Sequence, residues 1–440
     1  MLWHLKVGGL GDVLTGLSRS LLKKGHLVEI ILPKYDCMDY TRIKSLKELD
    51  LELHSVFDGK KHKNKVWSAI VEGLPVYFIE PLHPAKFFWR GQFYGEPDDF
   101  KRFTYFCRAA LEFLLQSGKQ PDVIHCHDWH TAVVAPLYWD IYVPLGLDSA
   151  RLAFTCHNFE YQGSEPAGGL ASCGLNGGLV FSNVVTTVSP TYAQEVLRPE
   201  GGKGLHQTLR QHSRKFFGVL NGIDDEAWNP VADSLLDHQY SADDLRGKEA
   251  NKTMLREHLG LATQGDDARR PLVGCITRLV PQKGVHLIRH SIYRTLEHGG
   301  RFILLGSSPI PHIQYDEALS HSIYAASDIF VIPSIFEPCG LTQMIAMQYG
   351  SIPVVRETGG LADSVFDVDN ESIPIEKRNG FSFQSPDEEG LNWALDRAIS
   401  YYKKKPDWWR KLVKKVMKID FSWDISADQY VDLCNQIVTN

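Results

Sequence analysis

The hydrophobic and polar positions of this chain follow two alternating periods. From residue 12 to residue 22 apolar side chains recur every three or four positions, which predicts an amphipathic helix that Gly25 ends. A second helical face is expected over residues 103–114. Short apolar runs predict buried strands at 27–32, 66–70, 74–79, 123–125, 152–155, 184–188 and 217–220. This alternation is typical of a parallel sheet covered by helices.

The second half of the chain repeats the pattern after an irregular polar stretch, residues 225–270, which includes a helical segment near 243–259. Strands are expected at 272–276, 302–305, 329–332 and 352–355, and helices at 285–296, 341–349, 388–401, 408–417 and from about 426. Open α/β sheets bind ligands beyond the carboxyl ends of their strands. The polar residues that follow each strand are therefore the first candidates for a site.

Length, charge and cysteine content exclude several classes of protein. A chain of 440 residues is too long for one core and suits two domains. The formal net charge is −6, so no general basic field would attract nucleic acid, and no apolar run is long enough to span a bilayer. The eight cysteines are scattered without a C-x-x-C pair, which predicts neither disulfides nor a zinc site and fits a reducing compartment.

The motif Gly-Gly-Leu-x-Asp occurs twice, at residues 8–12 and 359–363. Each copy opens a helical pattern, so each is expected to turn bare backbone N–H groups toward an anion. One copy in each half suggests two nucleotide-fold domains that face one ligand across a cleft.

Two basic residues, Arg278 and Lys283, flank a proline-containing turn just after the strand expected at 272–276. Arg278 has a planar guanidinium that can donate two parallel hydrogen bonds, and Lys283 has a compact ammonium charge, so together they could hold a diphosphate. The alternative is a solvated turn without a ligand.

The segment Phe336–Gln343 lies between an expected strand and an expected helix. The N–H groups of Gly340, Leu341 and Thr342 would open that helix and favour an anion. Glu337 at the strand end could accept hydrogen bonds from sugar hydroxyls or stabilise developing positive charge, or it could cap the helix. Cys339 has no base beside it in sequence, so packing is expected for its thiol.

Three histidines and a cysteine occupy residues 125–130. Side chains of an extended chain alternate between faces, so these four cannot all converge on a metal. His127 is placed to face the cleft, and Asp128 is expected to cap the following helix. After the next strand, His157 and Asn158 could bind sugar hydroxyls or order a loop.

Together these motifs resemble the starch and glycogen synthases that use a nucleotide sugar. The markers run almost from end to end of the chain: Lys6–Asp12, His125–Trp129, Asn221–Asp224, Arg278–Gly284, Phe336–Gln343 and Thr358–Asp363. Residues 87–95 and 154–160 are most similar to plant soluble class-four starch synthases.

The resemblance implies a GT-B fold, an α/β architecture of two Rossmann-like domains whose parallel sheets face each other across a cleft. It implies an acceptor-side domain of residues 1–222, a nucleotide-sugar domain of residues 223–420 and a C-terminal helix, 421–440, that returns to the first domain. The implied activity is transfer of glucose from ADP-glucose to the non-reducing end of an α-1,4-glucan, with retention of the anomeric configuration. A plastid location, in chloroplasts or amyloplasts, follows from the family alone.

The resemblance also assigns roles to residues. Arg278 and Lys283 hold the diphosphate, Glu337 faces the donor sugar and His127 lies beside the transferring glucose. No metal is expected, because cations and helix dipoles can neutralise the charge of the leaving ADP. No other cofactor is expected either, because ADP-glucose is itself a substrate. The substrate-binding set is Lys6, Gly8, Gly9, Asp98, His157, Asn158, Asn221, Cys339, Gly340, Leu341, Thr342, Thr358, Gly359 and Gly360.

One departure from the family concerns the second sheet. Pro309–Gln314 runs straight into Tyr315, where family members carry a helix and a strand. Loss of a central strand would leave unpaired backbone groups and a gap in the core. The alternative prediction is therefore a catalytically impaired variant, or a non-catalytic glucan-binding or scaffold homologue.

Overall fold

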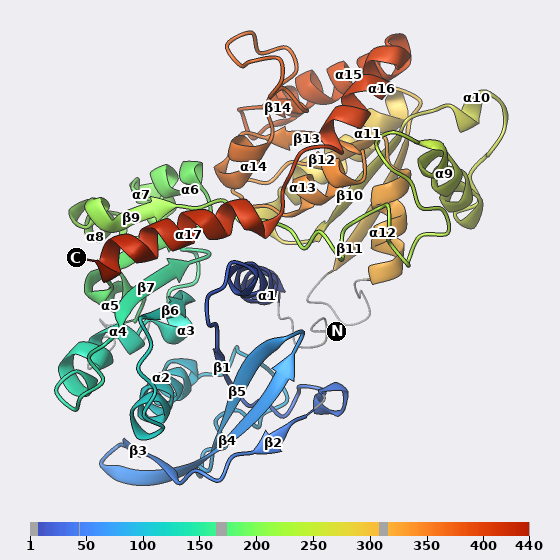
Figure 1. The fold of residues 1–440 in the computed structure, drawn as a ribbon. Coiled ribbons are helices and arrows are strands. Elements are labelled where there is room, and N and C mark those ends of the chain that lie inside the picture. Colours follow the sequence, from blue (N-terminus) through green and yellow to red (C-terminus); the bar gives the residue numbers. More distant parts are fainter. Residues whose placement is uncertain (1–7, 44, 164–173, 308–315, 440) are drawn as a thin grey trace. The chain divides into compact units, whose positions relative to one another are not determined.

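The chain folds into two compact units in the computed structural model, which describes residues 8–43, 45–163, 174–307 and 316–439 (Figure 1). Within these ranges the first unit comprises residues up to 188, residues 193–222 and residues from 423 onward. The second unit comprises residues 189–192 and 223–422.

The described strands of the first unit form two sheets. Their bounds are β1 (Ile30–Pro33), β2 (Lys47–Glu48), β3 (Leu53–Phe57), β4 (Lys60–Val71), β5 (Leu74–Pro81), β6 (Val123–His127), β7 (Arg151–Cys156), β8 (Val184–Thr187) and β9 (Phe216–Gly218). One sheet has the order β6-β7-β8-β9, and all of its strands run parallel. The other has the order β1-β5-β4-β2 with β3 beside β4, and only its β1–β5 pair is parallel. A parallel sheet was expected for the first half, and this prediction is wrong for the pairs that β4 forms with β2, β3 and β5, which are antiparallel.

Two tight turns account for the antiparallel pairs. Asp58 and Gly59 join β3 to β4, and Glu72 and Gly73 join β4 to β5. All four residues have positive φ, between 50° and 82°. Two-residue turns with positive φ match the right-handed twist of paired strands and therefore produce hairpins.

The helices of the first unit cover these sheets. The α-helices are α1 (Gly8–Lys23), α2 (Asp99–Gln116), α3 (Asp128–Thr131), α4 (Val134–Leu137), α5 (Gly174–Phe181), α7 (Pro199–Gly202), α8 (His206–Gln211) and α17 (Trp423–Val438), and α6 (Pro190–Glu195) crosses the division between the units. The described part of this unit also contains the 3₁₀ helices η2 (Tyr40–Arg42) and η5 (Ser213–Lys215) and the π-helix η3 (Tyr138–Tyr142).

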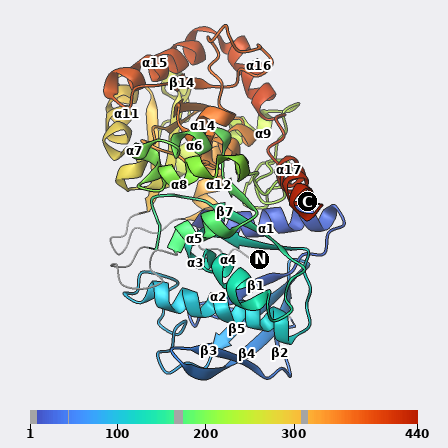
Figure 2. The same ribbon diagram turned by 90° about the vertical axis from the view of Figure 1, so that its left-hand side faces the viewer.

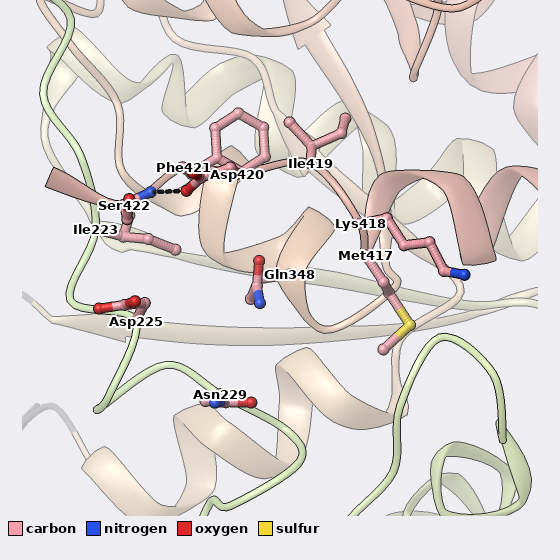
Figure 3. Close-up of a pocket in the computed structure, with 10 residues that line it drawn as sticks. All are labelled: Ile223, Asp225, Asn229, Gln348, Met417, Lys418, Ile419, Asp420, Phe421 and Ser422. Atoms are coloured by element: carbon pink, nitrogen blue, oxygen red, sulfur yellow. Dashed lines mark hydrogen bonds between the residues drawn. The ribbon is translucent and has the colours of Figure 1, made fainter. Parts of the chain in front are cut away.

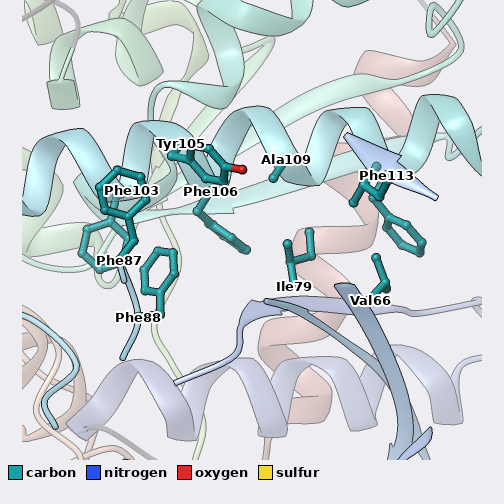
Figure 4. Close-up of a cluster of buried hydrophobic side chains, with 10 residues drawn as sticks. Val66, Ile79, Phe87, Phe88, Phe103, Tyr105, Phe106, Ala109 and Phe113 are labelled. Carbon is teal, nitrogen blue, oxygen red and sulfur yellow. The ribbon is translucent and has the colours of Figure 1, made fainter. Parts of the chain in front are cut away.

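Helix α2 packs on β3 and β5 of the mixed sheet (Figure 2). Asp99 stabilises its first turn, because the carboxylate accepts hydrogen bonds from the N–H groups of Gly95 and Glu96 at 2.6 and 3.1 Å. Its apolar face contributes to a buried aromatic cluster (Figure 4) that comprises Leu53, Val66, Ile79, Phe87, Phe88, Phe103, Tyr105, Phe106, Ala109 and Phe113. Each fully buried phenylalanine contributes about 1.5–3 kcal/mol, so this cluster anchors the helix to the sheet.

The C-terminal helix α17 packs on α1 and on β7 and β8 of the first unit. A glycine permits the close approach to α1, because a Cβ atom built on Gly16 would lie 2.0 Å from Nε1 of Trp423. Trp423 is buried there with Val13, Leu17, Val219, Ala427 and Tyr430.

The close contact between Gly16 and Trp423 predicts that adding one methyl group at residue 16 lowers stability. Gly16→Ala should force the Trp423 ring from its position and lower the free energy of unfolding by about 1–3 kcal/mol, despite the better helix propensity of alanine. Urea unfolding followed by circular dichroism measures this loss. A variant as stable as the wild type would show that α1 and α17 do not pack this closely.

The described strands of the second unit form one parallel sheet with helices around it. Its strands are β10 (Leu272–Arg278), β11 (Arg301–Ser307), β12 (Ile329–Ile332), β13 (Ile352–Arg356) and β14 (Phe381–Phe383). Its helices are α9 (Arg246–His258), α10 (Gly265–Ala268), η6 (Pro281–Lys283), α11 (Val285–Glu297), α12 (Glu317–Ala326), α13 (Thr342–Gln348), α14 (Gly359–Ser364), α15 (Glu388–Lys404) and α16 (Pro406–Val416).

The described strands of this sheet are continuous in the order β11-β10-β12-β13-β14. Strand β11, which precedes the shortened segment, lies at the edge. Residues 309–314 themselves lie outside the described residues, but the neighbouring strands β10 and β12 pair directly through Val273 and Gly274. The expected gap in the middle of the sheet is therefore wrong, and the shortened segment adjoins an edge strand.

Candidate active site

Two turns are bound together at the carboxyl edge of the second sheet, one after β10 and one after β12. The N–H of Ile335 donates to the carbonyl oxygen of Gln282 at 2.8 Å, and the Gln282 amide donates to that of Phe336 at 3.3 Å. Gly284 has a φ of +67°, and a Cβ atom there would lie 2.2 Å from the Pro333 carbonyl oxygen. Only glycine permits this backbone approach, which fixes the turn bearing Lys283 against the turn bearing Glu337.

Lys283, Ser334 and Glu337 meet where these turns touch. The Lys283 ammonium lies 2.5 Å from Oε2 of Glu337, and the Ser334 hydroxyl donates to the same oxygen at 2.9 Å. Glu337 is 7% exposed and Ser334 is 1% exposed. The carboxylate expected to face a ligand is thus held by one cation and one hydroxyl.

Arg278 ends β10 with an exposed side chain. Within the described ranges, the structure gives its guanidinium no hydrogen-bond or ion-pair partner, so its planar fork is available to an anion. The same ranges provide no acceptor for the backbone N–H groups of Gly340, Leu341 and Thr342. A cation and three open amides therefore border the turn that carries Glu337.

The second glycine motif makes backbone contacts that the sequence pattern did not predict. The Gly360 N–H donates to the carbonyl oxygens of Glu337 and Pro338 at 3.0 and 3.2 Å, so it is not bare. A Cβ atom on Gly359 would lie 2.0 Å from the Glu337 carbonyl oxygen, and one on Gly360 would lie 1.8 Å from that of Cys339. These glycines let α14 contact the backbone of residues 337–339. Thr358, just before them, is buried. Its backbone carbonyl oxygen accepts a hydrogen bond from the N–H of Leu361.

Sequence reasoning missed a second support for this turn. The Ser189 hydroxyl donates to the carbonyl oxygen of Pro338 at 2.6 Å. The Asp363 carboxylate of the glycine motif accepts from both the N–H and the hydroxyl of Thr191, at 2.8 and 2.7 Å. Nothing in the sequence signals these contacts, because more than 140 residues separate the partners.

In the first unit, three histidines gather at the carboxyl ends of β6 and β7. Nδ1 of His127 lies 3.0 Å from Nε2 of His157, and the rings of His125 and His127 have centroids 4.2 Å apart. His125 also forms a 2.7 Å hydrogen bond with the Thr155 hydroxyl. Residues two apart on a strand share a face, so His125 and His127 lie together.

Burial keeps these rings neutral. It lowers the pKa of His125 to about 3 and that of His157 to about 4, and it also lowers the pKa of His127. Burial raises the pKa of Asp128 to about 6. Asp128 does not cap α3 as expected, because its φ is +56° and its carboxylate accepts from the His157 N–H at 2.7 Å.

The histidine cluster predicts sensitivity to acid. An unfolded chain takes up protons on histidine near pH 6.5, but folded His157 does so only near pH 4. Its contribution to stability is therefore complete above pH 6.5 and is lost as the pH falls through 4. The melting temperature should fall between pH 7 and pH 4.5, and less steeply in His157→Gln. Calorimetry measures both slopes, with the exposed His258→Gln as control, and equal slopes in all three proteins would contradict the prediction.

Asp98 is held by an arginine that the sequence did not single out. Both of its carboxylate oxygens accept hydrogen bonds from Arg90, the second at 2.9 Å from Nη2. This ion pair lowers the pKa of Asp98 and fixes its side chain before α2.

The remaining predicted substrate-binding residues differ in burial and in their hydrogen bonds. Lys6 lies outside the described residues, and Gly8 and Gly9 begin α1. Asn158 accepts from the Glu160 N–H at 2.9 Å and orders a turn. Asn221 is 6% exposed, and its Oδ1 has no hydrogen-bond partner in the described structure. Cys339 is buried.

The cavity in Figure 3 involves other residues. It encloses about 250 Å³ in the second unit and is lined by Ile223, Asp225, Asn229, Gln348, Met417, Lys418, Ile419, Asp420, Phe421 and Ser422. None of these is a predicted site residue. In the described part of the chain, no group of three or more His, Cys, Asp or Glu side chains is arranged to hold a metal ion.

Known proteins match the chain along most of its length. The starch synthase catalytic domain family matches residues 2–211, and glycosyl transferases group 1 matches residues 310–415. A glycogen synthase of Protochlamydia amoebophila is 47% identical over 486 aligned residues, which cover 98% of this chain and 96% of that protein. The chain belongs to the starch and glycogen synthase family. The family resemblance inferred from the motifs is confirmed.

One plant member of the family is more similar to this chain than that glycogen synthase. Probable starch synthase 4 of Arabidopsis thaliana, which is named chloroplastic/amyloplastic, is 62% identical over 478 aligned residues. The match covers 99% of this chain but only 46% of that protein, so the chain spans about half the length of this relative. The alignment is longer than the 440 residues of the chain, so the relative has residues without a counterpart here.

A solved structure agrees with the fold. The catalytic domain of starch synthase IV from Arabidopsis thaliana, bound to ADP and acarbose, has 61% identity and a TM-score of 0.94, covering all of this chain and 98% of that one. The prediction of an α/β GT-B fold with two Rossmann-like sheets is confirmed. No described helix is both long and apolar enough to cross a membrane.

Proposed function

We propose that this chain is a retaining glycosyltransferase that moves glucose from ADP-glucose to the non-reducing end of an α-1,4-glucan. The proposal rests mainly on the ion pair between Lys283 and Glu337, which lie on two turns that are hydrogen-bonded to each other. Arg278 and the N–H groups of residues 340–342, which have no acceptor in the described structure, border this ion pair. Family membership and the similarity to a starch synthase structure bound to ADP and acarbose support the choice of substrates.

The residues of the second unit would act on the donor. Arg278 and the N–H groups of residues 340–342 would bind the diphosphate and stabilise the charge that develops as ADP leaves. Lys283 carries three N–H donors, so it can contact a phosphate oxygen and keep its bond to Glu337. Glu337 would face the donor sugar and stabilise positive charge at the anomeric carbon as the bond to ADP weakens.

The histidine cluster of the first unit would contact the transferring glucose. His127 would donate or accept a hydrogen bond as a neutral ring, since its pKa is lowered. The acceptor hydroxyl would attack from the face that ADP leaves, which retains the configuration. Asp98, fixed by Arg90, would lie on the acceptor side. No step requires a metal, and we propose that none is used.

We further propose a plastid location, supported by the chloroplastic/amyloplastic names of the plant relatives, at 62% and 43% identity. Bacterial glycogen synthases are also close relatives. Import of the full-length protein fused to a fluorescent reporter into isolated plastids tests this location.

The experiment for the activity is incorporation of labelled glucose from ADP-glucose into maltooligosaccharides by the purified chain. We expect longer oligosaccharides whose new residues β-amylase releases, since that enzyme cleaves α-1,4 bonds from the non-reducing end. A circular dichroism melt establishes that the sample is folded. A folded sample without incorporation would favour the alternative of a non-catalytic homologue.

A further inference from the structure

A buried serine contacts the carboxylate proposed to act on the donor sugar. Ser334 follows β12 by two residues, and its hydroxyl lies 2.9 Å from Oε2 of Glu337. The side chain is 1% exposed, so water does not compete for this bond. A carboxylate bound to an ammonium can only accept, so the hydroxyl of Ser334 is the donor.

The position of Ser334 is set by the backbone around it. The carbonyl oxygen of Pro333 touches Gly284, and the N–H of Ile335 donates to Gln282. Both neighbours of Ser334 are thus attached to the turn that carries Lys283. This arrangement aims the hydroxyl and the ammonium at one oxygen of Glu337 and leaves Oε1 without either of them.

The two groups differ in what they can do when a nucleotide sugar is bound. Lys283 is also proposed to contact the diphosphate, so its ammonium would be shared between Glu337 and phosphate oxygens. In the described structure the Ser334 hydroxyl bonds only to Glu337. It is therefore the contact that can hold the carboxylate in place throughout the reaction.

We infer that Ser334 is a positioning residue for transfer: it orients Glu337 toward the donor sugar while Lys283 engages the diphosphate. The inference rests on the proposed function and names a further residue of the same site. The Ser334 side chain is buried and its hydroxyl bonds to Glu337, so its loss should slow turnover and leave donor binding nearly unchanged.

The test compares Ser334→Ala with the wild type in glucose transfer from ADP-glucose. Loss of one hydrogen bond to a charged group should lower kcat by about 10- to 100-fold. The KM for ADP-glucose and the calorimetric Kd of ADP should change by less than about three-fold, because the phosphate contacts remain. Ser334→Thr, which keeps the hydroxyl, should recover most of the turnover.

A double-mutant cycle gives a second readout that does not depend on whether threonine fits. Because Ser334 acts through Glu337, adding Ser334→Ala to Glu337→Gln should lower kcat far less than it does in the wild type. Ser291→Ala is the matched control, since Ser291 is equally buried but donates to the backbone of its own helix at 2.7 Å.

The outcomes are distinct. An active wild type whose Ser334→Ala variant keeps its kcat, or loses donor affinity and turnover equally, would overturn this inference alone. Additive losses in the double-mutant cycle would also overturn it. A folded wild type without any transfer would overturn the proposed function, and this inference with it.

Discussion

Glu337→Gln should lower kcat by about 100- to 1000-fold, the usual cost of removing one preorganised electrostatic group from an active site. The substitution keeps the shape of the side chain and removes its charge. Ser334 can still donate to the amide oxygen, so the turn should keep its structure. The loss should therefore fall on the transition state, where positive charge develops on the sugar, and the KM for ADP-glucose should change little.

Initial rates over a range of ADP-glucose concentrations separate these two effects. Glu371→Gln is a suitable control, because it removes the same charge from an exposed position of the second unit. If Glu337→Gln raised KM and left kcat intact, Glu337 would only bind the donor.

Combining Arg278→Ala with Lys283→Ala should lower kcat/KM for ADP-glucose by about 100-fold or more, since each charge-assisted contact to phosphate is worth about 1.5–3 kcal/mol. Arg278 is exposed and makes no ion pair in the described structure, so its loss should leave the fold intact. The single variant Lys283→Ala also removes a partner of Glu337 and should lower kcat as well as donor affinity.

Arg278→Lys refines this prediction. Lysine keeps the charge but not the planar fork, so a bidentate contact to phosphate would be only partly replaced. Arg410→Ala removes an exposed arginine from α16 and controls for net charge. Unchanged kinetics in the double variant would refute the phosphate role of both residues.

The parallel parts of the fold followed from hydrophobic pattern alone. The strand expected at 329–332 is β12 with the same bounds, and most other buried strands differ by a few residues at their ends. The mixed sheet was missed because short apolar runs do not reveal strand direction. A signal was present in the pairs Asp58–Gly59 and Glu72–Gly73, since two residues of this kind between apolar runs are typical of hairpin turns.

The site could be predicted only where its residues belong to one local motif. Arg278 ends β10, and Lys283 and Glu337 follow β10 and β12, whose carboxyl ends share an edge, so their place after expected strands marked them as candidates. Ser334 is near Glu337 in sequence, but a serine in a loop carries no pattern of its own. Arg90, Ser189 and Thr191 act through contacts that depend on the folded backbone. The close packing of the second glycine motif on residues 337–339 could not be predicted, because close packing and anion binding both select glycine.

The most direct test of the proposed diphosphate site is a crystal structure of the chain with ADP. Phosphate oxygens should lie within hydrogen-bond distance of the Arg278 guanidinium, the Lys283 ammonium and at least one N–H of residues 340–342. A diphosphate bound elsewhere, with Arg278 and Lys283 both out of its reach, would contradict it.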